Sequence, residues 1–222
     1  MSIVQAYTEA YRNYLFDESR TMGRADYIAF PRNEAELVEA VRFARDNHVP
    51  LTAQGARTGL AGGASPQGGM ILNLSRMDRI LGIRRDEAGR FLLRVQPGVA
   101  LTTVRKALKN KSFDVSAWDE ESRETLKDVR AGALCFSPDP ASIGGMASCN
   151  ACGARSFLYG CTRKHVNALR AVLADGRVTQ LMRGRERARG REFELPCTDG
   201  SVVRGRLPDF DTPDIKDAGY LF

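Results

Sequence analysis

Apolar residues recur at helical spacing in two stretches near the start of the chain. The first stretch, Ile3, Tyr7, Ala10, Tyr14 and Leu15, predicts an amphipathic N-terminal helix over residues 2–16. The second predicts a helix that ends near Asn47; Asn33 can cap it and Glu36 occupies the capping-box position. Short apolar runs predict strands on either side, at residues 27–30, 51–54 and 70–74. This order predicts a strand–helix–strand unit with an enlarged loop before its last strand.

Further along, the pattern predicts hairpins and shorter helices. Residues 80–84 and 91–95 flank turn residues and predict paired strands, and a helix capped by Thr102 or Thr103 follows and ends near Lys111. Asp-Gly pairs at 175–176 and 199–200 predict two more hairpins, which join 166–174 to 177–182 and 193–195 to 202–203. Charges of both signs crowd residues 117–130, which we interpret as a solvated helix or surface insertion.

Composition narrows the class of protein. The 222 residues are 43% hydrophobic and 27% charged, which excludes disordered, collagen-like and coiled-coil chains. Five cysteines are too few for a disulfide scaffold at this length and predict free thiols in a reducing cytosol. No apolar run is long enough to cross a bilayer, so we expect a soluble cytoplasmic protein without a signal peptide, with peripheral attachment to the inner face of the membrane left open.

The positive charge does not by itself indicate a nucleic-acid partner. Lys and Arg outnumber Asp and Glu by 33 to 27, a formal net charge of +6. Five arginines gather in residues 183–191, but they alternate with Glu and Gly and have no aromatic residues between them. We therefore interpret this stretch as a solvated segment and expect no nucleic-acid binding.

Glycines gather in the loop at residues 54–63, QGARTGLAGG, between two predicted strands. Such a loop can turn successive backbone N–H groups toward one point, and the missing Cβ atoms let a phosphate approach closely. The spacing matches neither the dinucleotide fingerprint nor the P-loop. The pattern therefore predicts an anion-binding loop, and a flexible surface turn is the alternative.

A second region rich in small residues covers 136–163. Ser142 can cap a helix there, and the pair Gly144 and Gly145 would expose N–H donors to an anion or a flavin edge. The alternative is that Gly144, Gly145 and Gly153 only permit tight packing. Two such loops in one chain could close on one diphosphate-bearing ligand.

These segments, in this order, resemble the FAD-binding domain of the vanillyl-alcohol oxidase and para-cresol methylhydroxylase superfamily. The resemblance is to the glycolate oxidase and D-lactate dehydrogenase branch, covers residues 25–182, and includes GARTGLAGG, LLRVQPGVA and SIGGMASCNACGARSFLYG. It implies an α+β fold of two lobes, a small βαβ lobe at 25–78 and a larger mixed lobe at 79–182, with FAD between them. Residues 1–24 are then a lead-in, and 183–222 a basic segment and hairpin at the start of a cap domain. We expect the chain without that cap to be inactive.

The resemblance also implies which residues bind FAD. In the first loop, which holds the pyrophosphate in that family, the implied ligands are Gly55, Arg57, Thr58, Gly59, Leu60, Gly62 and Gly63. In the second region, which lines the flavin and ribityl chain, they are Pro138, Ser142, Gly144, Gly145, Met146, Asn150, Gly153 and Tyr159. Residues 55–63 contain neither His nor Cys, so we expect FAD to be bound non-covalently. Cys152 departs from the small residue usual at its position and would bring a thiol near the cofactor.

The implied activity is the oxidation of a 2-hydroxy acid such as glycolate or D-lactate by hydride transfer to flavin N5. A separate acceptor, a quinone or an iron–sulfur protein, would then take the electrons. The sequence identifies no catalytic residue, since His48 and His165 fit structural or exposed positions. Two alternatives stay open: a catalytically silent FAD-binding scaffold, and a metal or iron–sulfur module with Cys135, Cys149, Cys152 and Cys161 as ligands.

Overall fold

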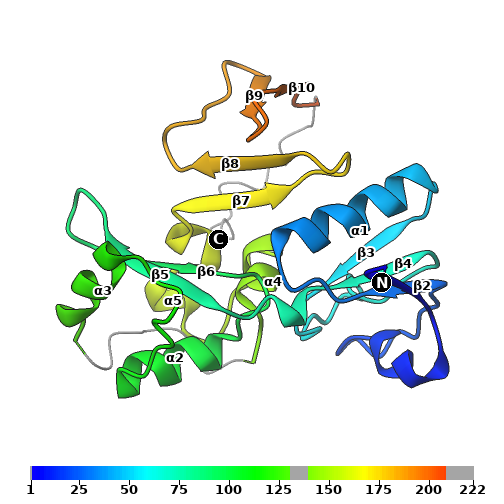
Figure 1. The fold of residues 1–222 in the computed structure, drawn as a ribbon, viewed down its shortest axis with the longest axis horizontal. Helices are drawn as coiled ribbons and strands as arrows, with labels where there is room; N and C mark the ends of the chain where they lie inside the picture. The colour runs from blue at the N-terminus through cyan, green and yellow to red at the C-terminus, as the bar shows by residue number, and fades with distance from the viewer. Residues whose placement is uncertain (1, 131–139, 209–222) are drawn as a thin grey trace. The chain divides into compact units, whose positions relative to one another are not determined.

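The computed structural model describes residues 2–130 and 140–208, and its helices and several separate sheets form a mixed α and β fold (Figure 1). The chain divides into two compact units. The first contains residues up to 167 together with 172–176, and the second contains 168–171 and the residues from 177 onward. The first unit thus holds the predicted small lobe and the predicted larger lobe up to residue 167, whereas residues 168–171 and 177–182 of that lobe belong to the second unit. The lobe boundary near residue 78 stays a prediction.

A four-stranded sheet forms the first part of the first unit, in the order β1-β2-β4-β3. Its strands are β1 (Val4–Ala6), β2 (Tyr27–Ala29), β3 (Leu51–Gln54) and β4 (Met70–Asn73). β2, β3 and β4 are parallel, and β1 is antiparallel to β2. Helix α1 (Glu34–Asp46) connects β2 to β3, so the predicted strand–helix–strand unit is confirmed.

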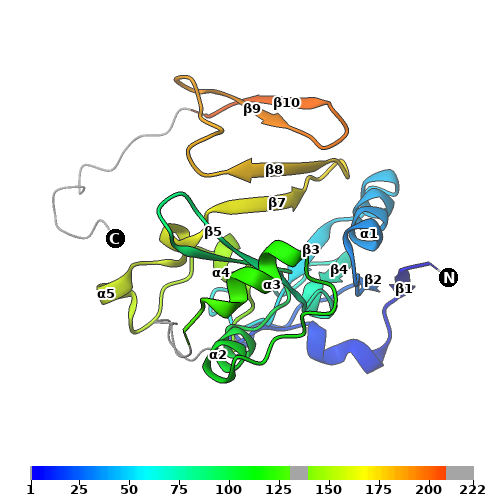
Figure 2. The ribbon, with the colours of Figure 1, turned by 60° about the vertical axis from the view of Figure 1, so that its left-hand side comes forward.

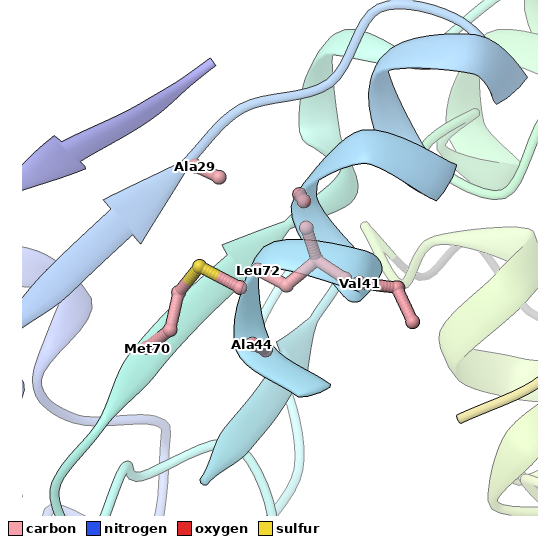
Figure 3. Close-up of a cluster of buried hydrophobic side chains, with 6 residues drawn as sticks. Ala29, Val41, Ala44, Met70 and Leu72 are labelled. Atoms are coloured by element: carbon pink, nitrogen blue, oxygen red, sulfur yellow. The ribbon is translucent and has the colours of Figure 1, made fainter. Parts of the chain in front are cut away.

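Both faces of this sheet are covered, because alternate residues of a strand point to opposite sides. On one face, Ala40, Val41 and Ala44 of α1 pack against Ala29, Met70 and Leu72 (Figure 3). On the other face, Ile28, Phe30 and Ile71 pack against Tyr11, Tyr14 and Leu15. The cap of α1 is the predicted one, with the Asn33 side chain accepting from the Glu36 N–H at 3.0 Å.

The predicted N-terminal helix over residues 2–16 is wrong. Residues 4–6 form strand β1 at the sheet edge, and only Glu9–Tyr14 form a helix, the 3-10 helix η1. Apolar residues in the stretch that suggests one long helix in fact pack in two separate hydrophobic clusters, one on each face of the sheet. Ile3 and Val4 pack on the α1 side of the sheet, whereas Tyr11 and Tyr14 pack on the opposite side.

The rest of the first unit is built on a two-stranded antiparallel sheet with short helices around it. Its elements are η2 (Leu74–Arg76), β5 (Ile80–Arg85), β6 (Phe91–Val95), α2 (Leu101–Asn110), α3 (Glu120–Lys127), α4 (Ile143–Ser148), α5 (Ser156–Tyr159) and η3 (Thr162–His165). The hairpin of β5 and β6 is confirmed. Neither predicted threonine caps α2: the cap position is Ala100, because the Leu101 N–H is held by the Ala141 carbonyl at 3.0 Å.

The charged stretch 117–130, predicted as a solvated helix or surface insertion, is anchored to strand β5 by buried side chains. Trp118 is 3% exposed and donates from Nε1 to the Ile80 carbonyl at 2.8 Å, and the Ser122 hydroxyl accepts from the Ile83 N–H. Asp119 caps α3, and hydrogen bonds from the Ser122 side chain and N–H and from Arg84 lower its pKa to about 2. The charges face solvent, as predicted, while Trp118, Ser122 and Val129 attach the segment to β5.

The second unit is made of β-hairpins (Figure 2). Its strands are β7 (Ala168–Val172), whose last residue belongs to the first unit, β8 (Val178–Met182), β9 (Glu192–Pro196) and β10 (Val202–Arg206). β7 pairs with β8, and β9 with β10, as the Asp-Gly turns predict. A bridge between Thr179 and Cys197 connects the two pairs. Glu186 accepts from the Met182 N–H at 2.6 Å and so shapes the turn that begins the arginine-rich segment.

Candidate cofactor site

The first glycine-rich loop follows β3 and is held at both ends by a buried glutamine. Gln54 is 1% exposed, and its Nε2 donates to the Tyr14 carbonyl at 2.7 Å and to the Ala64 carbonyl at 2.6 Å. Its Oε1 accepts from Asn73 at the end of β4. The two ends of the loop are therefore tied to each other and to the N-terminal segment.

A buried carboxylate provides a second anchor for this loop. Asp17 Oδ1 accepts from the Ser19 N–H at 3.0 Å, and Oδ2 accepts from the Ala64 N–H at 3.1 Å. Burial is the largest influence on the pKa of Asp17 and raises it, but hydrogen bonds from Ser19 and Ala64 outweigh burial and leave the pKa below its usual value. Asp17 is not among the site residues that the sequence predicts. The Asp-x-Ser spacing, typical of a local side-chain turn, was the available signal.

Between these anchors the backbone donors are unoccupied. Within the part of the chain that the structure describes, the N–H groups of the seven consecutive residues from Arg57 to Gly63 have no hydrogen-bond acceptor. Arg57 and Gly62 have positive φ, +58° and +74°, and Leu60 is 80% exposed. Because unpaired N–H groups favour an anionic acceptor, this loop fits a pyrophosphate.

The side chains of the first loop contribute less than the sequence suggested. Arg57 donates to the Asn13 carbonyl at 2.7 Å, and its guanidinium lies 4.4 Å from the centre of the Tyr14 ring. The guanidinium of Arg57 is thus bound to the N-terminal segment. Thr58 is half-buried. A Cβ on Gly59 would come no nearer than 4.0 Å to any other described group, and one on Gly63 would meet nothing. The protein itself therefore does not require glycine at these two positions.

The two glycine-rich regions meet at Ser142. Its hydroxyl is buried and accepts from the Ala56 N–H at 3.2 Å and from the Gly145 N–H at 3.4 Å. A Cβ on Gly55 would collide with this hydroxyl. Residues about 90 positions apart, 55–56 and 142–145, are thereby brought into contact.

The donors of the second region, in contrast, are already paired. Gly144 donates its N–H to the Pro97 carbonyl at 2.8 Å, and Ile143 donates to the Val99 carbonyl at 2.8 Å. Gly145 is held by the Ser142 cap, and Met146 packs in the core with Leu101 and Ala141. The expectation that Gly144 and Gly145 expose N–H donors to an anion is therefore wrong. A Cβ on Gly144 would lie 2.6 Å from the Pro97 ring, so tight packing explains this glycine.

Three of the remaining predicted residues, Asn150, Gly153 and Tyr159, lie on the chain that follows α4. Asn150 has a φ of +47° and accepts from the Arg163 N–H at 2.9 Å, which ties α4 to η3. Gly153 donates its N–H to the Ser156 hydroxyl, and Tyr159 is partly exposed on α5. Pro138 lies outside the described residues.

Two cysteines of this region are not free thiols. Cys152 and Cys161 form a disulfide, which corrects the expectation of free thiols at these positions, and Cys149 is free and exposed. Sulfurs joined to each other are not thiolate ligands, so this pairing argues against the four-cysteine metal site. Cys135 lies outside the described residues, and those that are described contain no group of three or more side chains suited to a metal.

Solved structures of flavin oxidases share this fold. The chain matches 6-hydroxy-D-nicotine oxidase from Arthrobacter nicotinovorans with a TM-score of 0.59 and 20% identity, over 82% of this chain and 36% of that one. It matches glucooligosaccharide oxidase from Acremonium strictum, described as holding 6-S-cysteinyl, 8α-N1-histidyl FAD, with a TM-score of 0.58 and 20% identity, over 81% and 34%. The fold is therefore that of the vanillyl-alcohol oxidase and para-cresol methylhydroxylase class of flavoproteins, as predicted.

The FAD binding domain family matches residues 25–117 and 116–182, and the chain belongs to that family. D-lactate dehydrogenase from Anaerostipes hadrus is 31% identical over 180 residues, 78% of this chain and 33% of that protein. Glycolate oxidase subunit GlcD from Bacillus subtilis (strain 168) is 31% identical over 157 residues, 68% and 28%. The chain thus spans about a third of the length of these relatives. Among the described residues, no helix is both long and apolar enough to span a membrane.

Proposed function

We propose that this chain is the FAD-binding part of a flavoprotein that oxidises a 2-hydroxy acid by hydride transfer to flavin N5. The observation that carries the proposal is the run of unpaired N–H groups from Arg57 to Gly63, held open between Gln54 and Asp17. Membership of the FAD binding domain family indicates that the ligand of this loop is FAD. The relatives named for D-lactate and glycolate support the substrate class.

In this proposal the first loop binds the pyrophosphate through its backbone. Several N–H groups can share the negative charge of two phosphates, and the absence of side chains at Gly59 and Gly63 lets the ligand approach the main chain. The Asp17 carboxylate would hold the end of this loop in place, through its hydrogen bonds from the Ser19 and Ala64 N–H groups. The second region would contribute its backbone surface and Asn150, Gly153 and Tyr159 along the ribityl chain and flavin.

Bound FAD would supply the two-electron acceptor, and this chain's residues would hold and orient it. We propose that the attachment is non-covalent, because the first loop contains no His or Cys and the Cys152 and Cys161 sulfurs are joined to each other. A separate quinone or iron–sulfur protein would reoxidise the flavin. Acid precipitation tests the attachment: all flavin fluorescence should stay in the supernatant, and fluorescence in the washed pellet would show a covalent bond.

Titration of the FAD-free protein tests cofactor binding. We expect saturable quenching of FAD fluorescence and a flavin absorbance band at about 450 nm in the protein fraction. A sulfur-to-metal absorbance without a flavin band would instead support the cysteine-bound metal site. We expect this chain alone to stay inactive, so the substrate class is tested on the FAD-loaded flavoprotein with its cap domain. That protein is mixed anaerobically with D-lactate, L-lactate, glycolate or 2-hydroxyglutarate. Bleaching by one of these acids, and not by acetate, is expected; no bleaching by any of them would contradict that class.

A further inference from the structure

Three cysteines lie close together in the sequence of the second region, and two of them are bonded. Cys149 ends α4 and is exposed, Cys152 is exposed, and Cys161 is half-buried just before η3. The Cα atoms of Cys152 and Cys161 are 4.8 Å apart, within the range a disulfide requires. A disulfide that solvent reaches is open to attack by dissolved thiols, unlike one enclosed in a core.

The bond closes a ring around an exposed segment. Helix α5 lies inside the ring and has no buried residue, and Phe157 and Leu158 point their side chains into solvent. Within the ring, Gly153 donates to the Ser156 hydroxyl and Gly160 donates to the Ser156 carbonyl. Because core packing does not fix this segment, the covalent link is a main restraint on its conformation.

The ends of the ring stay together without the bond. Thr162 donates both its N–H, at 3.2 Å, and its hydroxyl, at 2.7 Å, to the Ala151 carbonyl. Thr162 itself is buried. Reduction would therefore loosen residues 153–160 but keep the two thiols near each other, which favours formation of the same bond on reoxidation.

The local charge favours thiol exchange. Residues 140–174 contain no Asp or Glu, whereas Arg155, Arg163 and Lys164 lie on either side of Cys161 in the sequence. Positive charges stabilise both an attacking thiolate and the departing one. The same charges attract anionic thiols such as glutathione.

We propose that Cys152–Cys161 is a thiol–disulfide exchange site whose substrates are small thiols, and that its redox state sets the order of residues 153–160. A thiolate attacks Cys152 Sγ, forming a mixed disulfide, while the Cys152–Cys161 bond breaks and Cys161 leaves as a thiolate that takes a proton. A second thiolate attacks the mixed disulfide, and Cys152 leaves and is protonated. Two thiols are oxidised to one disulfide, and the protein gains two electrons and two protons.

Differential alkylation of the folded protein tests the exchange without reference to FAD. The protein is labelled with N-ethylmaleimide before and after incubation with millimolar glutathione, and peptides are analysed by mass spectrometry. We expect Cys152 and Cys161 to be unlabelled at first and labelled together afterwards, while Cys149 is labelled in both samples. Labelling before reduction would show that the bond is absent. Labelling only after denaturation would show a structural disulfide, and either result would overturn the proposal.

The effect on order has its own readouts. Trypsin cleavage after Arg155 should be faster in the reduced protein and in the double variant Cys152→Ser/Cys161→Ser, and unchanged in the matched control Cys149→Ser. Equal cleavage rates would overturn the claim about order. If the proposed function holds, reduction should also weaken FAD binding by about threefold or more, since the loosened segment must be ordered again. Equal FAD affinity in both states would show that residues 153–160 do not contact the flavin. Absence of FAD binding in both states would reject the proposed function, but it would not contradict the exchange site, which the alkylation experiment tests separately.

Discussion

The two glycine-rich regions meet at Ser142, yet they differ in what their backbones offer. From Arg57 to Gly63 the N–H groups have no acceptor within the described chain. A Cβ on Gly63 would meet nothing within 4 Å, and one on Gly59 would have Asp17 Oδ2 as its nearest neighbour, at 4.0 Å. Around Gly144 the donors are bound to Pro97 and Val99, and the glycine lies against Pro97. Packing within the chain thus explains Gly144 in the second region, whereas it does not explain Gly59 and Gly63 in the first.

This difference shows that glycine content alone does not identify a binding loop. What distinguishes the two regions is the state of their hydrogen bonds and the space beside each Cα atom. Substitutions that fill this space therefore separate the two roles, because a packing glycine affects unfolding and a ligand glycine affects affinity.

The largest effect is expected for Gly144→Ala. The new Cβ would lie 2.6 Å from the Pro97 Cβ and 2.9 Å from its carbonyl oxygen, and neither group can rotate away. We expect a loss of unfolding free energy near the upper end of about 1–3 kcal/mol, measured by urea unfolding without FAD. Gly63→Ala is the control and should change stability by less than about 0.5 kcal/mol. Equal stability of the two variants would contradict the packing role of Gly144.

A somewhat smaller effect is expected for Gly55→Ala, about 2 kcal/mol of unfolding free energy, because its Cβ meets a hydroxyl that can rotate at the cost of its hydrogen bonds. The same substitution should cost less in a Ser142→Ala background, where the hydroxyl is gone. A double-mutant cycle measures this coupling. Additive effects would show that Gly55 and Ser142 do not touch.

The third prediction concerns the anchor Asp17. Asp17→Asn replaces one of two accepting oxygens by a donor, and we expect it to cost about 1–2 kcal/mol at neutral pH. Since hydrogen bonds hold the pKa of Asp17 below 3.8, its contribution is complete above that pH and is lost as pH falls through the lower folded-state value. Urea unfolding across this range should therefore show the two proteins converging only in strong acid. Convergence already above about pH 5 would contradict the lowered pKa.

Local patterns predicted most helices and strands because their signals lie within a few residues. The Asn33 cap, the β5–β6 hairpin and the turns at Gly176 and Gly200, both with positive φ, are examples. The N-terminal helix failed because the apolar residues of 3–15 pack on two faces of a sheet whose other strands come later in the chain.

The site was less predictable, because its decisive contacts join distant parts of the chain. The glycines of both regions were visible, but the pairing of Gly144 with Pro97, and of Ala56 with Ser142, depends on the folded backbone. Nothing in the local sequence showed that Asp17 would hold the end of a loop at Ala64. Cys152 was noticed for its thiol, but its pairing with Cys161 follows from the turn between them.

The most direct test of the central claim is an FAD titration of Gly59→Val beside the unchanged protein. A Cβ at this position has its nearest neighbour, Asp17 Oδ2, at 4.0 Å, so the branched side chain should leave the unfolding free energy within about 0.5 kcal/mol of its original value. The same side chain would occupy the space that a pyrophosphate needs. We expect FAD affinity to fall at least tenfold, about 1.4 kcal/mol or more, with the fold intact. Unchanged affinity in a stable Gly59→Val protein would show that the first loop does not hold the cofactor.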